Sequence, residues 1–388
     1  MRSINALGSH PDERPPSGHS GMKIGVAANA LGHGGGIERY VRDVVSGLAA
    51  RGIEPAVFIR RLDNSLPESR LVEPHPIAAS FLPSKLRDHW FSWRLREARR
   101  TAGVDVLIGC NRVDSADIGI CGGTHLGFLR AAGRKPNPSD RWQVALERRY
   151  YARASVIVAH SKLMRDEMQE LYGVAKSKIR VLYPPTDGAR FAPTDDANRL
   201  RLRRKYGFGD DEIVLLFPSS SHGRKGLPAI ERALEGMALP VVLAVAGRAP
   251  GQTSGRVRYL GFVRQIEECY QAADFTILAS RYEPFGMVGV ETIMCGTPAI
   301  LSSRVGALEV IAPRAKFTFD SDDVDGLRAA IERAARSLGS GRNVSSADLL
   351  YNPSVSKHVG SLLRLARRIH GGDCLQCGDD EGLVGDAA

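Results

Sequence analysis

The sequence MKIGVAANALGHGGGIERYVRDVVSGLAARG, residues 22–52, predicts a strand, a glycine-rich loop and a helix, in that order. Residues 22–31 are mostly apolar and favour a strand, and GHGGG then interrupts them. Residues 37–51 place apolar side chains at helical spacing, and Gly52 ends the helix. Strands that alternate with helices indicate a parallel sheet covered on both faces. This unit therefore predicts an α/β fold.

The same alternation continues on both sides of one interruption. We expect strands in PAVFIR, VDVLIG, ADIGICGGTH, ASVIVAH and KIRVLY, and then a linker in YPPTDGARFAPTDDANRL (183–200), which is rich in Pro, Asp and Gly. The alternation begins again at EIVLLFPSSS. We therefore predict two Rossmann-like domains that face each other across a cleft. The expected parts are a disordered leader (1–21), a first domain (22–185), a second domain (186–352), a C-terminal helix (353–370) and a disordered acidic tail (371–388).

The composition excludes a membrane-spanning protein. Of the 388 residues, 43% are hydrophobic, and no apolar run approaches the roughly 20 residues that a spanning helix requires. The first 21 residues are polar and rich in Pro, Gly and Ser, so they lack the apolar core of a secretory signal. We expect a cytoplasmic protein.

The cysteines do not predict a disulfide framework. Cys110, Cys121, Cys269 and Cys295 lie in apolar segments, where a reduced cysteine behaves as a small hydrophobic residue. The last two form a CxxC in the acidic tail, without the further ligands of a zinc site or the strand and helix of a thioredoxin-like motif. We interpret this segment as a disordered tail, with metal or redox chemistry as the alternative.

The basic residues behind the net charge of +10 concentrate in residues 85–100 and 129–153, where arginines alternate with aromatic side chains. This mixture suits an anionic membrane surface, at which each Lys or Arg contributes about 1 kcal/mol. The alternative is a solvated helix face whose aromatic side chains lie in the core. We expect no nucleic-acid binding, because that hypothesis depends on net charge alone.

Two glycine-containing turns are candidates for anion binding, since ligands of open α/β sheets lie beyond the carboxyl ends of the strands. GHGGGIERY could bring backbone N–H groups close to an anion, although it lacks the full GxGxxG spacing and could be a plain tight turn. SSSHGRKGLP places Arg224 and Lys225 beside Gly226 at an expected helix start. Two cations there oppose the helix dipole, and a bound diphosphate would remove that conflict.

The third candidate is RYEPFGMVGVE, residues 281–291, which follows the apolar strand DFTILAS. Pro284 and Gly286 delay the helix until about Met287, so Glu283 lies on the loop and Glu291 about one turn into the helix. Both carboxylates are expected at the mouth of the cleft. The helix dipole alone would explain Glu291, but it does not explain Glu283.

Together these motifs resemble a known family. Residues 213–312 are similar to the donor domain of the retaining GT-B glycosyltransferases of family 4. RKG matches the phosphate motif of that family, and Glu283 and Glu291 match its E-x7-E motif. GGIERY and CGGTH match the first half of that family more loosely. The order of the chain and its basic aromatic segments are most similar to the lipopolysaccharide-core glucosyltransferases.

The resemblance implies a reaction. The first domain would be the acceptor side and the second the nucleotide-sugar donor domain of a GT-B fold. The protein would transfer a hexose, with glucose from UDP-glucose expected, to a lipid-linked envelope glycan such as lipopolysaccharide core, with retention and at the inner face of the cell membrane. The alternatives are a soluble acceptor, such as a sugar phosphate or inositol, and a non-catalytic nucleotide-sugar binding protein.

The resemblance also assigns roles to residues. Arg224 and Lys225 would stabilise the departing diphosphate, Glu283 would hold hydroxyls of the sugar, and Glu291 those of the ribose. His125 in CGGTH would contact the transferred sugar near its anomeric centre, with His160 in VAHSK as the alternative. Backbone groups expected to assist at the diphosphate are those of Gly35, Gly36, Gly286, Met287 and Val288. We expect no cofactor and no catalytic metal, because the acidic runs TDDAN and SDDVDG suit solvated helix caps.

Overall fold

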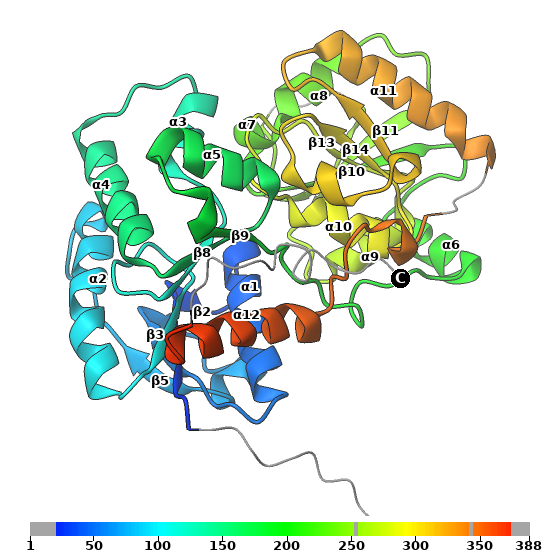
Figure 1. The fold of residues 1–388 in the computed structure, drawn as a ribbon. Helices are drawn as coiled ribbons and strands as arrows, with labels where there is room; N and C mark the ends of the chain where they lie inside the picture. Colours follow the sequence, from blue (N-terminus) through cyan, green and yellow to red (C-terminus); the bar gives the residue numbers. More distant parts are fainter. Residues whose placement is uncertain (1–20, 252–254, 341–343, 374–388) are drawn as a thin grey trace, which may run out of the picture.

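Two parallel sheets form the framework of the protein (Figure 1). The computed structural model describes residues 21–251, 255–340 and 344–373. The first sheet contains, in spatial order, β5 (Glu73–Pro76), β3 (Ala56–Ile59), β1 (Ile24–Ala27), β6 (Val106–Gly109), β7 (Ile118–Cys121), β8 (Val156–Ala159) and β9 (Ile179–Val181). The second contains β12 (Val257–Gly261), β11 (Val241–Gly247), β10 (Ile213–Ser219), β13 (Phe275–Leu278), β14 (Ala299–Ser302) and β15 (Lys316–Phe319). A short pair, β2 (Ala30–Leu31) and β4 (Arg61–Leu62), lies apart from both.

The helices follow the strands along the chain. In the first domain they are α1 (Gly36–Ala49), α2 (Ser84–Thr101), α3 (His125–Ala131), α4 (Pro138–Arg153) and α5 (Lys162–Tyr172). In the second they are α6 (Asp196–Lys205), α7 (His222–Lys225), α8 (Leu227–Leu234), α9 (Ile266–Ala272), α10 (Met287–Met294) and α11 (Val324–Ser337). The last helix of the described chain is α12 (Val355–His370).

Apolar strands explain why helices cover both faces of the first sheet. Strands β1, β3, β6, β7 and β8 are buried along their whole length, as expected of a parallel sheet. On one face Val44 and Val45 of α1 pack into the core, and on the other Phe91 of α2 and Tyr150 of α4 do so. The alternation of the sequence is thus explained by burial on two sides.

Helix α12 returns from the second domain to the first. Its residues Val359 and Leu362 are buried in the same core as Val44 of α1, and Figure 1 shows it beside α1. The sequence predicted this amphipathic helix but not its partner. The chain therefore crosses between the domains twice, once before α6 and once before α12.

The predicted α/β fold with two facing domains is confirmed, and two edge strands were missed. β5 has the sequence EPHP, whose prolines an edge position tolerates because fewer of its N–H groups are needed for pairing. β15 lies at the edge of the second sheet. Both sequences lack the apolar run that marks the inner strands.

Other predictions are tested only where the chain is described. Cys110, Cys121, Cys269 and Cys295 are buried and not joined in disulfides within the described chain, which confirms their assignment as core residues. Along the described segments, no helix has both the length and the apolarity needed to cross a membrane. The predicted leader, up to residue 20, and the CxxC of Cys374 and Cys377 lie outside the described residues.

Candidate active site

A cleft of about 970 Å³ lies between the two domains. It is lined by residues that follow the carboxyl ends of strands in both sheets, such as Gly122 and His160 in the first and Glu283 in the second. Among the described residues, all of the predicted site residues except His125 line it: Gly35, Gly36, Arg224, Lys225, Glu283, Gly286, Met287, Val288 and Glu291. The position at strand ends is the one expected for a ligand site in such sheets.

The glycine loop leaves one wall of the cleft uncovered at the start of α1. Gly35 has φ −80°, which other residues also adopt, so its backbone does not require glycine. A Cβ added at Gly35 would come no closer than 3.7 Å to the described chain, and at Gly36 it would meet nothing within 4 Å. Packing within the protein therefore does not explain these glycines, whereas close approach of a ligand would.

The RKG segment lies at a helix start, as predicted, and also ends a second, short helix. Arg224 and Lys225 are the last two residues of the short helix α7, and Gly226 separates them from α8. Gly226 has φ 84°, and a Cβ there would lie 2.1 Å from Ala279 O. Both cations directly precede Gly226, the N-cap of α8, so they lie at a helix start as predicted, whereas the separate short helix α7 that they end was not predicted. Both side chains line the cleft.

Lys225 is anchored with its charged end inside the protein. Its Nζ donates a hydrogen bond to Pro218 O at 2.9 Å. Burial lowers the pKa of Lys225, and the nearby carboxylate of Glu283 acts in the opposite direction. An anion entering the cleft would stabilise the charged form further.

Glu283 lies on the loop after β13, as predicted. Its Oε2 accepts a hydrogen bond from Arg224 Nη1 at 2.9 Å, and the same nitrogen donates to Tyr282 O at 3.0 Å. The backbone of Glu283 is bonded on both sides, from its N–H to Arg304 O and from Gly306 N–H to its carbonyl. The expected sugar-binding carboxylate and the expected phosphate-binding cation are thus fixed next to each other.

Glu291 lies one turn into α10, as predicted, but it has specific partners. One carboxylate oxygen pairs with Arg39 of α1, and the other accepts a hydrogen bond from Tyr270 OH at 2.8 Å. Arg39 comes from the first domain, so this ion pair bridges the cleft. Glu291 raises the pKa of Arg39. A helix dipole is therefore not what explains this buried carboxylate.

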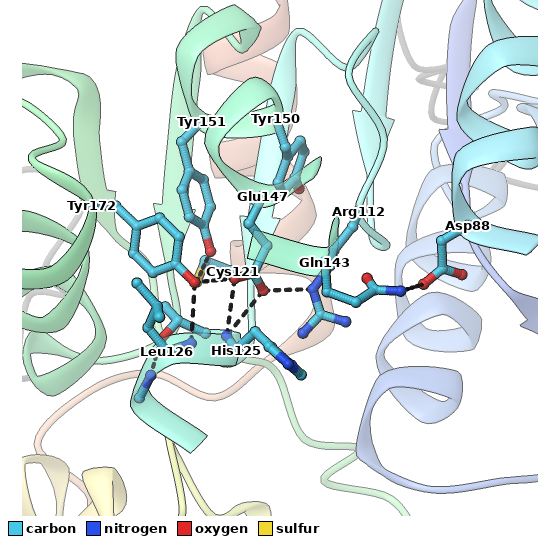
Figure 2. Close-up of polar contacts among 12 residues, drawn as sticks. Asp88, Arg112, Cys121, His125, Leu126, Gln143, Glu147, Tyr150, Tyr151 and Tyr172 are labelled. Carbon is cyan, nitrogen blue, oxygen red and sulfur yellow. Dashed lines mark hydrogen bonds and ion pairs between the residues drawn. The ribbon is translucent and has the colours of Figure 1, made fainter. Parts of the chain in front are cut away.

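The structure does not place His125 among the described residues that line the cleft. Its Nε2 is 2.8 Å from Asp140 Oδ1, and its backbone N–H donates to the buried carboxylate of Glu147. Figure 2 shows Glu147 between Arg112 and Tyr172, both of which donate to it. The predicted contact of His125 with a sugar has no support in this arrangement and stays a prediction.

The position of His125 has a simple cause. Strand β7 ends at Cys121, and Gly122 and Gly123 carry the chain onward before Thr124 caps α3. His125 therefore begins a helix and does not stand at the strand end, where Gly122 lines the cleft. The histidine that does line the cleft is His160, the alternative candidate, directly after β8.

Two further residues of the cleft, Arg39 and Asp43, were not predicted from the sequence. Arg39 stands within GGIERY, so its proximity to the glycine loop was visible, but its pairing with Glu291 was not. Asp43 lies one turn further along α1 and also lines the cleft. Burial raises its pKa to about 7, and Arg39 and Arg42 act against this increase.

Some aromatic residues of the basic segments lie in the core, as one interpretation predicted, and others are exposed, as a membrane surface would require. Phe91, Tyr150 and Tyr151 are core residues, whereas Trp93 is 57% and Trp142 53% exposed. Several arginines are engaged internally: Arg96, Arg149 and Arg153 contact Asp114, and Arg99 contacts Asp117. The segments are therefore less available to a lipid surface than their composition indicated.

The acidic runs act as helix caps, as expected. Asp195 of TDDAN accepts a hydrogen bond from Asn198 N, and Asp323 of SDDVDG accepts one from Gly326 N. No group of three or more His, Cys, Asp or Glu side chains within the described segments is arranged to hold a metal ion. Whether the reaction needs a metal stays a prediction.

Known proteins resemble this chain over both domains. Residues 34–190 match the sequence family described as Glycosyltransferase Family 4, and residues 198–340 match Glycosyl transferases group 1. A probable transglycosylase of Burkholderia thailandensis is 59% identical over 351 residues, which cover 89% of this chain and 97% of that protein. A D-inositol 3-phosphate glycosyltransferase of Actinosynnema mirum is 26% identical over 329 residues, covering 72% of this chain and 78% of that protein.

Solved structures share the fold. WaaG, a glycosyltransferase involved in lipopolysaccharide biosynthesis, matches with a TM-score of 0.70 at 17% identity, over 91% of this chain and 96% of that one. HepE from Anabaena, solved in complex with UDP-glucose, matches with a TM-score of 0.68 at 17% identity, over 90% and 99%. These likenesses identify two domains of the GT-B type.

Proposed function

The chain belongs to the glycosyltransferases of the family 4 type, and from that membership we propose that it transfers a hexose from a nucleoside diphosphate sugar to a lipid-linked glycan of the cell envelope, with retention of configuration. UDP-glucose is the proposed donor and a lipopolysaccharide core the proposed acceptor. The reaction takes place in the cytoplasm, at the inner face of the membrane, without a cofactor or a catalytic metal.

The observation that carries this proposal is the pairing of Arg224 with Glu283 at 2.9 Å in the cleft, beside Lys225. Glycosyl transfer builds negative charge on the departing diphosphate while the sugar becomes cationic. Fixed cations and a fixed carboxylate side by side can stabilise these opposite charges without reorganisation. Arg224 and Lys225 meet the diphosphate, and Glu283 meets the sugar.

The glycines and the second glutamate complete the donor site. Gly35 and Gly36 leave room for the diphosphate, and the backbone at Gly286, Met287 and Val288 lies on the other side of the cleft. Glu291 binds the ribose hydroxyls. Although each of its oxygens has a protein partner, a carboxylate oxygen can accept more than one hydrogen bond.

Retention without a covalent intermediate fits the state of the cleft carboxylates. Glu267, Glu283 and Glu291 are each paired with an arginine, and burial raises the pKa of Asp43, the other carboxyl named at the cleft, which disfavours its charged, nucleophilic form. Pairing lowers the nucleophilicity of a carboxylate, since attack on the sugar would leave the arginine without its counter-charge. A front-face reaction, in which the acceptor attacks from the side of the leaving diphosphate, is therefore proposed.

The donor experiment is a hydrolysis screen. Purified protein is incubated with UDP-, GDP- and ADP-linked hexoses in the absence of an acceptor. NMR follows the released nucleoside diphosphate and the anomeric configuration of the released sugar. We expect release from UDP-glucose with the α-anomer formed first. Release of the β-anomer first would contradict retention. Release from another nucleotide sugar only would show that this sugar, and not UDP-glucose, is the donor.

A lipid-linked acceptor is supported by an exposed aromatic cluster on the first domain. Phe81, Trp90 and Trp93 have ring centroids 5.5 and 5.2 Å apart, and Phe81 and Trp93 are 65% and 57% exposed. Arg94 lies 5.8 Å from the Trp93 ring. Aromatic side chains beside cations suit the interface of an anionic bilayer. A soluble inositol or sugar phosphate acceptor is the second candidate, favoured by the 26% identity to the inositol phosphate enzyme.

Vesicle binding distinguishes these acceptor classes. Replacing Phe81 and Trp93 with Ser should reduce binding to phosphatidylglycerol vesicles about tenfold or more, because each ring loses more than 1 kcal/mol of apolar burial. Cosedimentation measures the effect, and Leu350→Ser, an exposed residue of the second domain, is the control. Equal binding of all three proteins would favour the soluble acceptor.

A further inference from the structure

His160 lies on the wall of the cleft formed by the first domain, at the end where Glu283 lies. Both residues line the cleft. The neighbouring Ser161 donates a hydrogen bond from Oγ to Pro284 O at 2.7 Å, and a Cβ added at Gly123 would lie 3.1 Å from Pro284 Cγ. The loop that carries Glu283 therefore meets the first domain next to His160.

The imidazole of His160 has packing partners but lacks a polar one. Its ring lies 4.8 Å from that of Tyr40, and the side chain is 6% exposed. Its Nε2 is buried and has no hydrogen-bonding partner in the described part of the protein. Buried nitrogens are rarely left in this state unless something absent from the resting protein pairs with them.

The nearby hydroxyl of Tyr40 is already engaged. His358 of α12 lies with Nδ1 3.0 Å from Tyr183 O and with Nε2 2.9 Å from Tyr40 OH. Because a carbonyl only accepts, Nδ1 of His358 carries the proton, and Tyr40 donates to Nε2. Tyr40 is thereby held in place with its ring against that of His160, and it does not supply the missing partner.

His160 is suited to a neutral ligand group. Burial, with a contribution from His358, lowers the pKa of His160 to about 3, so the ring is uncharged at neutral pH. An uncharged imidazole has one donor and one acceptor nitrogen, which match a hydroxyl group. The diphosphate, in contrast, is expected at the cations Arg224 and Lys225.

We propose that the imidazole of His160 hydrogen-bonds a hydroxyl group of the transferred sugar and so contributes to the choice of sugar. This inference rests on the proposed function, since it assumes a nucleotide sugar with its hexose at Glu283. It assigns to the end of β8 the sugar contact that sequence analysis expected from His125.

The test compares His160→Phe with wild type. Phenylalanine keeps the apolar contact with Tyr40 and removes both nitrogens. Calorimetry measures the dissociation constants of UDP, of UDP-glucose and of the UDP-glucose analogues that each lack one glucose hydroxyl. We expect an unchanged UDP affinity, about tenfold weaker binding of UDP-glucose, and one deoxy analogue that binds both proteins equally.

Stability provides an independent readout. A histidine kept for structure would lower the unfolding temperature when replaced, whereas removal of an unpartnered buried nitrogen should leave it unchanged or raise it. His75→Phe is the matched control, because His75 also stacks on a ring, at 4.9 Å from Phe58, and lies outside the described lining of the cleft.

Three results would overturn the proposal: equal affinity of wild type and His160→Phe for UDP-glucose, a parallel loss for UDP and UDP-glucose, or a reduced unfolding temperature without a loss specific to the sugar. A failure of the proposed function is distinct from these. It would appear as wild-type protein that binds neither UDP nor UDP-glucose, and the role of His160 would then be rejected together with the donor.

Discussion

Each of the three glutamates that line the described cleft is held by an arginine: Glu267 by Arg190, Glu283 by Arg224 and Glu291 by Arg39. An arginine fixes the orientation of its partner carboxylate through charge-assisted hydrogen bonds. The carboxylates are therefore prepared to accept hydrogen bonds from hydroxyl groups. At the scale of single residues, this suits the binding of a sugar and a ribose.

Asp43 differs from these glutamates, because burial raises its pKa to about 7 from 3.8. The charged form of Asp43 is thus disfavoured in the folded protein. The free energy of unfolding that the protonated carboxyl contributes is therefore lost as the pH rises from about 4 to 7. Asp43→Asn should therefore stabilise the protein at pH 8, by at least about 1 kcal/mol, and not at pH 4. Denaturant unfolding at both pH values measures this.

The opposite outcome, a variant that is equally stabilised at both pH values, would show that the change does not act through ionisation. Asp105→Asn serves as the control, because Asp105 lies on the first domain away from the described lining of the cleft. Because Asp105 accepts a hydrogen bond from Lys23 N–H at 2.7 Å, Asp105→Asn should not stabilise the protein at pH 8.

The sequence allows single residues of these ion pairs to be recognised more easily than the contacts between them. Glu283 and Arg224 each stood in a recognisable loop. Arg39 and Glu291, however, are 252 positions apart, and their contact depends on how the two domains meet. Nothing in local spacing specifies such a contact, and the same holds for the burial that shifts the pKa of Asp43.

At the scale of elements, the glycines of the two glycine-containing turns have different explanations: a Cβ would fit within the protein at Gly36 but not at Gly226. Gly36→Ala adds a Cβ that meets nothing within 4 Å of the described chain, at the first position of α1. We expect unchanged or slightly higher stability, by up to about 1 kcal/mol, and weaker UDP binding. Thermal unfolding and calorimetry on the same sample separate the two effects.

Gly226→Ala is the matched variant for comparison. Its Cβ would lie 2.1 Å from Ala279 O at φ 84°, so it should destabilise the protein by more than about 1 kcal/mol. If Gly36→Ala lowered stability as Gly226→Ala does, and left UDP binding intact, the glycine loop would be a structural turn.

The order of strands and helices was predictable because inner strands are apolar on both faces. The positions of the motif residues relative to the ends of those strands and helices could not be predicted. Three residues, Gly122, Gly123 and the N-cap Thr124, separate β7 from α3 and move His125 from the strand end to a helix start. A break at Gly226 likewise makes Arg224 and Lys225 the end of α7 as well as the residues that precede α8.

At the scale of the whole molecule, α12 ties the C-terminal part of the chain to the first domain. A Cβ placed on Gly47 of α1 would lie 2.6 Å from Val359 Cγ2, so the two helices pack closely. Val359→Ala should cost about 1 to 3 kcal/mol in unfolding free energy, because it opens a cavity at this contact. Denaturant unfolding measures the loss.

Arg367→Ala, on the exposed side of α12, should stay within about 0.5 kcal/mol of wild type. A Val359→Ala variant as stable as that control would show that α12 is not part of the first domain's core. The amphipathic pattern alone could not predict this return, since it specifies an apolar face and not the face that covers it.

The carboxyl ends of both sheets point to one cleft, and the central claim is that Glu283 in that cleft binds the donor sugar. The most direct measurement is the rate of acceptor-free hydrolysis of UDP-glucose by Glu283→Ala. Glu212→Ala is the matched control, because Glu212 also pairs with an arginine of the second domain at 2.9 Å but lies outside the described lining of the cleft. We predict a loss of about 100-fold or more for Glu283→Ala with an unchanged unfolding temperature, and a wild-type rate for the control. A Glu283→Ala protein that hydrolyses UDP-glucose at the wild-type rate would contradict the assignment of the site.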